Sequence, residues 1–286
     1  MLYRIFAATA FLLHMVWVSP VPAQTVSSSQ PTPGVTVPFE LVSGFLVVVN
    51  GRIGALGGLR FVIDTGTTTT IIDRKVAGRL KLRGRPGNVI NFDRTSAVEW
   101  AELPDLSVGP LRVGATPVTI ARLTDYSSFA ESIDGILGLD LLVRSGKLFI
   151  DYDARTVSLA VPGENQQQNP PPSCFVVRIA VQGHPMRLVL DTGVEDIVLN
   201  RERLRSQIPD MLTVGPHAAV TIGRLRATQL DLPAVRIGSK EAVATVLLIE
   251  GPNEFSPPGV DGYIGPASLH AKHIELDFVG RTLRWW

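Results

Sequence analysis

The pattern of apolar and polar positions predicts short strands rather than long helices. Runs rich in β-branched and apolar residues at 45–49 and 59–63 flank the turn signal Asn50-Gly51. The same hairpin pattern returns at 175–181 and 186–190. Helical spacing is confined to brief segments, which are 74–80, 200–206 and the stretches after Gly138 and Gly265. The sequence therefore predicts an all-β fold with a few short helices.

The second half of the chain repeats the motifs of the first at a nearly constant spacing. Asp-Thr-Gly occurs at 64–66 and again at 191–193, an offset of 127 positions. Asp-Gly-Ile-Leu-Gly at 134–138 returns as Asp-Gly-Tyr-Ile-Gly at 261–265, at the same offset. A unit of about 120 residues present twice indicates a duplicated domain, because solenoid repeats run to roughly 20–50 residues. Two similar lobes are therefore expected.

The paired Asp-Thr-Gly motifs are the candidate chemistry of the chain. Each copy ends an apolar run, and Gly66 and Gly193 allow a tight turn and a close approach of the opposing loop. Two carboxyls within hydrogen-bonding distance cannot both be ionised, so they share one proton and titrate as a pair. Such a pair can activate a water for acyl hydrolysis without a metal or a covalent intermediate. We therefore expect Asp64 and Asp191 to be catalytic.

Composition and charge narrow the classes of partner. The 286 residues are 45% apolar and carry a net charge of +1 with the signs interspersed, so no basic block favours nucleic acid. The single cysteine, Cys174, cannot form an intramolecular disulfide. His270 and His273 lie three positions apart, but no other ligands cluster with them. We expect no metal and no other cofactor.

The N-terminus has the pattern of a secretory signal. Arg4 precedes an apolar run over 5–18, and small residues up to Ala23 provide a cleavage site before Gln24. The run is shorter than the ~20 residues that span a bilayer, so cleavage of residues 1–23 is expected rather than a membrane anchor. The expected location is periplasmic or secreted, with no stable membrane insertion after cleavage.

Polar, proline-containing segments divide the rest of the chain. Residues 24–38 form a lead-in that we expect to be disordered, and residues 162–173 form a linker that ends in prolines. The first lobe is expected over 39–161 and the second over 174–286. The linker is long enough for the two lobes to pair within one chain, as a monomer, or with the lobes of another chain, as a domain-swapped dimer.

These motifs resemble those of the retropepsin-like aspartic proteases, of the bacterial exported type with two lobes fused in one polypeptide. Residues 191–199, Asp-Thr-Gly-Val-Glu-Asp-Ile-Val-Leu, are similar to the retroviral pattern Asp-Thr-Gly-Ala-Asp-Asp-Thr-Val-Leu. Residues 136–142 resemble the apolar-apolar-Gly motif and its short helix. The resemblance extends over residues 40–286. It implies two tandem β-barrel lobes that form an intramolecular pseudo-dimer, and an aspartic endopeptidase whose substrate is a peptide or protein.

The resemblance also implies roles for the residues that match the family's motifs. The catalytic dyad would be Asp64 and Asp191. The supporting positions of the two active-site loops, including the interlocked threonines, would be Thr65, Gly66, Thr67, Thr192 and Gly193. The positions that contact the substrate backbone would be Glu195 and Asp196 in the second lobe and, more weakly, Thr68 and Thr69 in the first.

The chain departs from the family pattern at three positions. Val194 follows the second Gly, whereas Thr67 follows the first. A threonine hydroxyl can donate to a carboxylate and valine cannot, so we expect the aspartates to be inequivalent, with Asp191 the more readily protonated. Leu139 and Pro266 stand where the retroviral enzymes carry Arg, so the ion pair of that Arg is absent.

A protease of this type needs a hairpin that closes over an extended substrate. The candidate tips contain Phe92, Asp93 and Arg94 in the first lobe and Gly223 in the second. Two working flaps, one flap with a stub, and two ordinary hairpins all fit the sequence. A catalytically inactive module of the same fold that binds a peptide or protein stays open as the alternative, because neither tip is rich in glycine.

Overall fold

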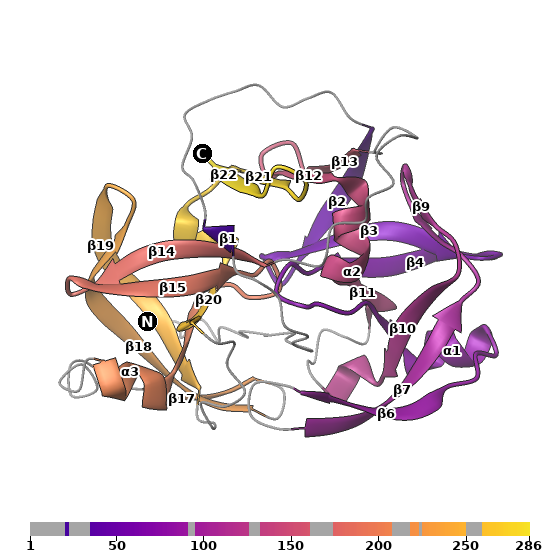
Figure 1. The fold of residues 1–286 in the computed structure, drawn as a ribbon, viewed down its shortest axis with the longest axis horizontal. Helices are drawn as coiled ribbons and strands as arrows, with labels where there is room; N and C mark the ends of the chain where they lie inside the picture. Colours follow the sequence, from indigo (N-terminus) through magenta and orange to yellow (C-terminus); the bar gives the residue numbers. More distant parts are fainter. Residues whose placement is uncertain are drawn as a thin grey trace.

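The computed structural model describes residues 21–22, 35–90, 95–125, 132–160, 174–207, 218–222, 225–249 and 259–286. The structure is mostly β and contains a closed six-stranded barrel. Figure 1 shows two lobes side by side, with the end of the chain in a sheet that joins them. Within the described ranges no helix is long and apolar enough to cross a membrane.

The first lobe is built from short strands and brief helical segments. Its strands are β2 (Thr36–Val42), β3 (Leu46–Ile53), β4 (Leu56–Ile63), β5 (Ile71–Asp73), β6 (Arg85–Ile90), β7 (Thr95–Leu103), β8 (Leu106–Val108), β9 (Leu111–Val113), β10 (Thr116–Ala121), β11 (Gly135–Leu137), β12 (Lys147–Asp151) and β13 (Thr156–Ala160). Its helical segments are α1 (Arg74–Arg79), η1 (Leu123–Asp125), α2 (Leu139–Leu142) and η3 (Val143–Ser145).

The second lobe uses fewer and longer strands. Its strands are β14 (Phe175–Val181), β15 (His184–Leu190), β16 (Ile197–Asn200), β17 (Ala218–Ile222), β18 (Leu225–Ile237), β19 (Lys240–Ile249), β20 (Gly262–Ile264), β21 (His273–Asp277) and β22 (Thr282–Trp285). Its helical segments are α3 (Arg201–Gln207) and η6 (Pro266–Leu269).

The two lobes share one pattern of strand pairing. In the first lobe β4 lies parallel to β11, β11 antiparallel to β5, and β5 parallel to β10. In the second lobe β15, β20, β16 and β19 repeat these pairings in the same order. The registers also agree, because Phe61 pairs with Gly135 and Leu188 with Gly262, each pair 127 positions from the other. The all-β, two-lobe fold predicted from the repeat is confirmed.

A sheet shared by both lobes fixes their relative position. Strand β12 pairs antiparallel with β21, and β13 and β22 lie outside them (Figure 1). Ile150 and Ile274 are opposite each other across the junction and both are buried. Lys147 Nζ also lies 3.0 Å from Asp277 Oδ2, but this partly exposed ion pair adds little. Backbone pairing and buried apolar side chains therefore hold the lobes together.

The first lobe begins before the predicted boundary at residue 39. Strand β2 starts at Thr36 because Thr36, Val37 and Pro38 pair with β13, and Val37 is buried. Within the expected signal, β1 (Val21–Pro22) lies parallel to the first residues of β14. The remainder of the expected signal, residues 24–34 of the lead-in and the linker 162–173 lie outside the described residues.

The expected short helices form with one difference between the lobes. Helix α1 begins after Asp73, which accepts a hydrogen bond from the N–H of Lys75 at 2.8 Å. Helix α3 begins after Asn200, whose Oδ1 accepts from the N–H of Arg203 at 3.1 Å. After Gly138 both α2 and η3 form. After Gly265 only the single turn η6 forms, because the next residue, His270, has a φ of 51° and ends it.

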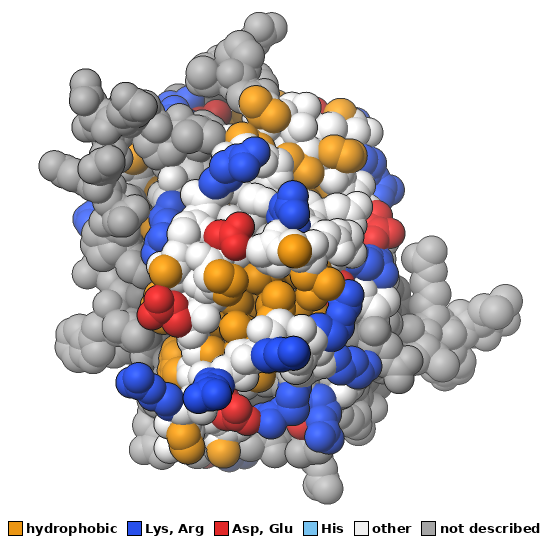
Figure 2. All heavy atoms as spheres, turned by 90° about the vertical axis from the view of Figure 1, so that its right-hand side faces the viewer, with side chains coloured by type: hydrophobic (Ala, Val, Ile, Leu, Met, Phe, Trp, Pro, Cys, Tyr) orange, Lys and Arg blue, Asp and Glu red, His pale blue; other side chains and the backbone are white. Residues whose placement is uncertain are grey.

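One face of the molecule shows how its charges are distributed. Figure 2 views the side of the first lobe and shows an apolar area surrounded by Lys and Arg side chains, with Asp and Glu among them. Both signs are therefore present on this face, in agreement with a net charge of +1.

Candidate active site

The two Asp-Thr-Gly loops meet where the lobes join. Asp64 follows β4, and its N–H donates to the carbonyl of Leu137 at 3.1 Å. Asp191 follows β15, and its N–H donates to the carbonyl of Ile264 at 3.0 Å. Both aspartates are completely buried. The repeat therefore carries the two carboxyls to equivalent positions, each held by the parallel strand beside it.

Thr65 and Thr192 interlock the two loops. The hydroxyl of Thr65 donates to the carbonyl of Leu190 at 2.8 Å, and the hydroxyl of Thr192 donates to the carbonyl of Ile63 at 2.7 Å. The N–H of each threonine donates to the hydroxyl of the other, at 3.1 and 3.2 Å. Each hydroxyl thus donates and accepts across the lobe boundary. Loss of either one leaves buried backbone groups unpaired, which is costly.

The carboxyls of Asp64 and Asp191 are hydrogen-bonded to each other. A Cβ at Gly66 would lie 2.3 Å from Cγ of Asp191, and a Cβ at Gly193 would lie 2.7 Å from Oδ2 of Asp64. These distances are shorter than any real Cβ contact. Glycine at both positions is therefore what lets each loop approach the opposing carboxyl.

The two carboxyls have unequal surroundings. Oδ1 of Asp64 accepts from the N–H of Gly66 at 2.8 Å and of Thr67 at 2.9 Å, and Oδ2 accepts from the Thr67 hydroxyl at 3.0 Å. Oδ1 of Asp191 accepts from the N–H of Gly193 at 2.7 Å. Oδ2 of Asp191 is buried and accepts no hydrogen bond of ordinary geometry from the described residues, although the N–H of the opposing Gly66 also acts to lower the pKa of Asp191. As an anion, Asp191 would therefore be much less well stabilised than Asp64.

The proton of the pair belongs on Asp191. Burial raises the pKa of Asp64 to about 6, against the opposing effect of the hydrogen bonds from Thr67, Gly66 and Asp191. Burial raises the pKa of Asp191 well above its ordinary value, and the negative charge of Asp64 raises it further. The ordering agrees with the lack of a hydroxyl at Val194, and it leaves Asp64 as the ionised member when one proton is shared.

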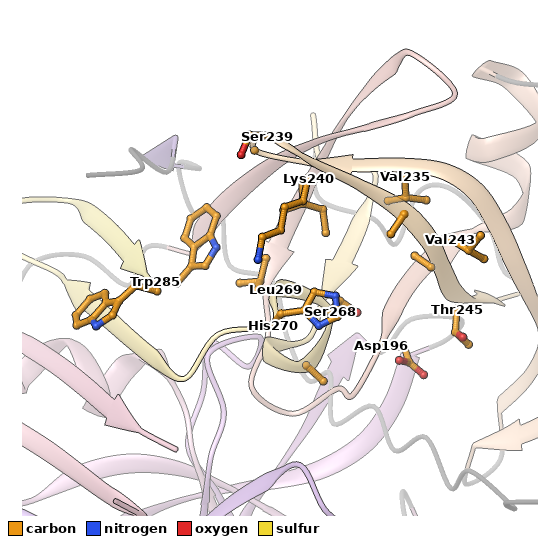
Figure 3. Close-up of a pocket in the computed structure, with 16 residues that line it drawn as sticks. Asp196, Val235, Ser239, Lys240, Val243, Thr245, Ser268, Leu269, His270 and Trp285 are labelled. Atoms are coloured by element: carbon orange, nitrogen blue, oxygen red, sulfur yellow. The ribbon is translucent and has the colours of Figure 1, made fainter. Parts of the chain in front are cut away.

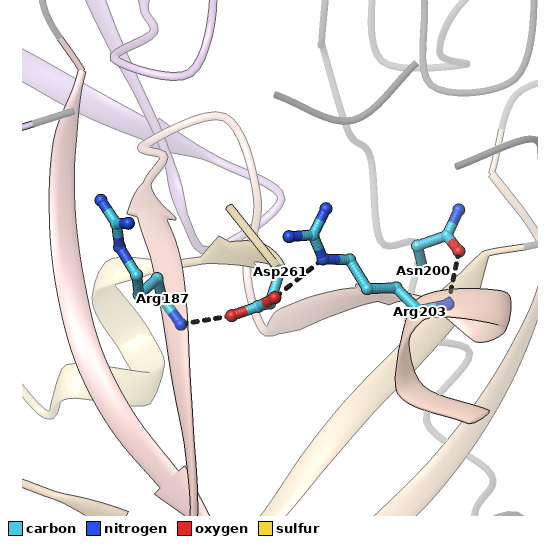
Figure 4. A network of polar contacts seen from close by, with 4 residues as sticks. All are labelled: Arg187, Asn200, Arg203 and Asp261. Atoms are coloured by element: carbon cyan, nitrogen blue, oxygen red, sulfur yellow. Dashed lines mark hydrogen bonds and ion pairs between the residues drawn. The ribbon is translucent and has the colours of Figure 1, made fainter. Parts of the chain in front are cut away.

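Asp134 and Asp261 support the loops from behind and take no part in the dyad. Asp134 Oδ2 accepts from the N–H of Arg60 at 2.8 Å, and Asp261 Oδ2 accepts from the N–H of Arg187 at 2.8 Å. In the second lobe, Arg203 Nε also donates to Asp261 Oδ1 at 2.8 Å (Figure 4). By accepting backbone N–H bonds, these carboxylates tie β4 to β11 and β15 to β20.

Asp140 is a supporting residue that the sequence reasoning missed. It lies in the first turn of α2, and its Oδ1 accepts from the Thr70 hydroxyl at 2.7 Å and from the Thr70 N–H at 3.0 Å. The Thr70 hydroxyl in turn accepts from the N–H of Gly138 at 3.1 Å. The available signal was an acidic residue at the start of a predicted helix. At an offset of 127, the second lobe has Ile197 and Ala267, which cannot make this contact.

The structure places the other predicted site residues in three ways. Thr68 and Thr69 directly follow the Asp64 loop, and the carbonyl of Thr68 accepts from the N–H of Asp140 at 3.1 Å. Glu195 and Asp196 follow the Asp191 loop and are half-buried, and Asp196 reaches the wall of a cavity in the second lobe. The flap-tip residues fall outside the described residues, although the hairpins β6–β7 and β17–β18 on either side of them are formed; these residues are Phe92, Asp93, Arg94 and Gly223.

Two other chemistries have little basis in the described residues. In that part of the chain no three His, Cys, Asp or Glu side chains are grouped so that they could hold a metal ion. The thiol of Cys174 is buried, which raises its pKa to about 11 and keeps it protonated. The ring of His273 packs against those of Phe149 and Trp286, which also contact each other.

Comparison with known proteins adds one finding. Residues 47–141 match the family model of the aspartyl proteases, which is of the retropepsin-like type. The matched range begins in β3, includes the Asp64 loop and ends in α2, so it lies within the first lobe. No curated protein matches the chain.

Proposed function

Because the chain is related through its first lobe to the retropepsin-like aspartyl proteases, we propose that it is an aspartic endopeptidase with a single active site formed by both lobes. The observation that supports this most strongly is the contact of Asp64 with Asp191 above the interlocked Thr65 and Thr192. This contact joins one carboxyl from each lobe, and its surroundings keep one of them protonated.

The reaction uses the inequivalence of the carboxyls. A water held between them loses a proton to ionised Asp64 while its oxygen bonds to the peptide carbonyl carbon, and the proton of Asp191 passes to the carbonyl oxygen. The tetrahedral intermediate then breaks at the C–N bond. The leaving nitrogen takes the proton held by Asp64, and a hydroxyl of the intermediate returns a proton to Asp191. Both carboxyls end in their initial states.

The remaining roles belong to the same proposal. The substrate is a peptide or protein bound in extended form, with its backbone contacted near Glu195 in the second lobe and near Thr68 and Thr69 in the first. The lobes pair within one chain, and the active form is a monomer. Residues 1–23 direct export, and N-terminal sequencing of the mature protein should find Gln24 first.

The test is a digest of a peptide library by the wild-type chain and by Asp64→Asn and Asp191→Asn, read by mass spectrometry. Each substitution should lower cleavage by about 10³-fold or more, since each removes a proton-transfer group from the dyad. Cleavage should continue in the presence of a chelator. Full activity of either variant would exclude the shared dyad. A wild-type chain that binds library peptides without cutting them would instead be the inactive binding module.

A further inference from the structure

The second lobe contains a cavity apart from the dyad. It has a volume of ≈ 840 Å³ and lies between the β18–β19 hairpin, η6 and the tryptophans at the end of β22, Trp285 and Trp286 (Figure 3). None of the residues 64–67 or 191–194 lines the cavity. Of the residues that do, Asp196 is the nearest in sequence to Asp191. Its volume is within the range of ligand sites, roughly 300–1,000 Å³.

The cavity lies where the two halves of the repeat differ. In the first lobe α2 and η3 bury Leu142 and Val143, and Arg144 donates to the hydroxyl of Thr116 in β10 at 3.3 Å. In the second lobe the corresponding segment is the single turn η6, whose Ala267 and Ser268 line the cavity. A shorter helical segment with smaller side chains thus leaves open the space that the first lobe fills.

Strand β19 presents an unpaired edge to this cavity. It pairs with β18 from Lys240 onward, but with β16 only from Val246 onward. Along residues 240–245 the second edge therefore has no strand partner among the described residues. Because side chains alternate along a strand, Ala244 points to one face of β19 and Val243 points to the other. Both line the cavity, so the cavity extends around the edge of the strand. An unpaired strand edge is a template for an added strand.

The walls of the cavity combine exposed apolar groups with an unpaired acid. Val243 is 67% exposed and Trp286 is 40% exposed, so two large apolar side chains that water reaches line the same cavity. The carboxylate of Asp196 makes no hydrogen bond or ion pair with any described residue. Burial and the nearby charges of Glu195 and Asp231 raise its pKa to about 6, so a cation beside it would relieve an unfavourable charge. In Figure 3, Lys240 lies on the opposite side of the cavity from Asp196.

We propose that this cavity binds an extended peptide segment that carries a basic side chain. The peptide backbone adds as a strand beside residues 240–245, its apolar side chains cover Val243 and Trp286, and its basic side chain pairs with Asp196. Binding in this way goes beyond the proposed protease activity, because it involves no bond cleavage and is expected equally of a chain with an inactive dyad.

The test uses two fluorescent probes and the Asp64→Asn chain, which cannot cut them under the proposed mechanism. One probe is a blocked hexapeptide of alternating Thr and Val with one Arg, and the other replaces that Arg with uncharged citrulline. Fluorescence anisotropy at low salt should show the Arg probe binding roughly fivefold more tightly, the effect of a partly buried ion pair. Adding Asp196→Asn should abolish this preference and leave the affinity for the citrulline probe unchanged.

Two further variants test the location of the peptide. Ser268→Trp should fill the cavity and weaken binding of both probes at least tenfold, whereas Ser268→Ala should not. Val243→Lys, at an exposed position where folding is not at risk, should weaken the Arg probe more than the citrulline probe. The proposal is overturned if neither probe binds at 1 mM or if Asp196→Asn keeps the Arg preference. Displacement of the probe by a statine-containing inhibitor of the dyad would also overturn it, because the probe would then occupy the catalytic cleft.

Discussion

Thr67 donates its hydroxyl to Oδ2 of Asp64 at 3.0 Å, and the residue at the same place in the second lobe, Val194, has no hydroxyl to donate. Oδ2 of Asp191 is consequently buried with no hydroxyl from its own loop directed at it. One carboxyl of the pair is stabilised as an anion and the other as an acid. The unequal environments of Asp64 and Asp191 therefore follow in large part from one difference between the repeats.

Thr67→Val should shift the acidic limb of the pH profile of kcat/KM to higher pH by roughly one unit. The substitution removes a hydrogen bond from the ionised form of Asp64, so the pKa of Asp64 rises above its value of about 6. The measurement is hydrolysis of a fluorogenic peptide from pH 4 to 9. Thr67→Ser keeps the hydroxyl and should keep the limb in place. An acidic limb that stays unmoved in Thr67→Val would mean that Asp64 is not the base.

Val194→Thr should move the alkaline limb of the same profile to lower pH. A new hydroxyl beside Asp191 would stabilise its anion and lower its pKa toward that of Asp64. Val194→Ile adds bulk without a donor and is the matched control. If Val194→Ile shifts the limb as far as Val194→Thr does, packing rather than hydrogen bonding controls the acid.

The dyad should also make stability depend on pH. Both carboxyls have pKa values in the folded state above the ordinary 3.8, so their contribution to stability is complete below about pH 4 and is lost as the pH rises through about 6 for Asp64. The free energy of unfolding should therefore fall from pH 4 to pH 7 by on the order of 1–3 kcal/mol more in the wild type than in Asp64→Asn. Urea unfolding at both pH values measures this difference. Asp153→Asn, at an exposed position, is the control and should behave as the wild type. If the wild type instead gained stability from pH 4 to pH 7 relative to Asp64→Asn, the raised pKa of Asp64 would be contradicted.

Thr192→Val should destabilise the chain by about 1–3 kcal/mol. The carbonyl of Ile63 would stay buried without its donor, and the N–H of Thr65 would lose its acceptor. Thr192→Ser retains the hydroxyl and should lose considerably less. Equilibrium unfolding in urea compares the two, and equal losses would show that the methyl group rather than the interlocking hydroxyl stabilises the lobe boundary.

Asp140→Ala should lower stability by about 1–3 kcal/mol and lower kcat as well. Its carboxylate accepts from both the N–H and the hydroxyl of Thr70, and it thereby braces the loop that carries Asp64. Asp140→Asn retains one acceptor oxygen and should lie between Asp140→Ala and the wild type. Unfolding and peptide hydrolysis are measured on the same preparations. An unchanged kcat in Asp140→Ala would limit this residue to a purely structural role.

The fold was largely predictable because the repeat keeps a nearly constant spacing. The offset of 127 between the Asp-Thr-Gly motifs recurs in the strand pairs, where Phe61 meets Gly135 and Leu188 meets Gly262. Hydrophobic alternation predicted the hairpins, and Asp73 and Asn200 mark the starts of α1 and α3. Alternation and capping depend on residues that are neighbours in sequence, and the repeat appears when the two halves are compared, so the sequence displays all three directly.

The differences between the lobes were less predictable because they depend on contacts between distant segments. Asp140 meets Thr70 only after α2 has packed on the Asp64 loop, and no periodicity records that meeting. The segments after Gly138 and Gly265 looked equally helical, yet the second forms only η6. The cavity beside η6 likewise depends on two distant segments. It forms because η6 is shorter than α2 and η3 together in the first lobe and lies next to the β18–β19 hairpin.

Pairing of β12 with β21 inside one polypeptide has an evolutionary consequence. In an assembly of two identical subunits, every substitution near the symmetry axis changes both carboxyl environments at once. Here each half is encoded separately, so a mutation such as the one that distinguishes Val194 from Thr67 alters a single partner and leaves the other intact. Each carboxyl environment can thus be adjusted on its own, which an assembly of two identical subunits does not allow.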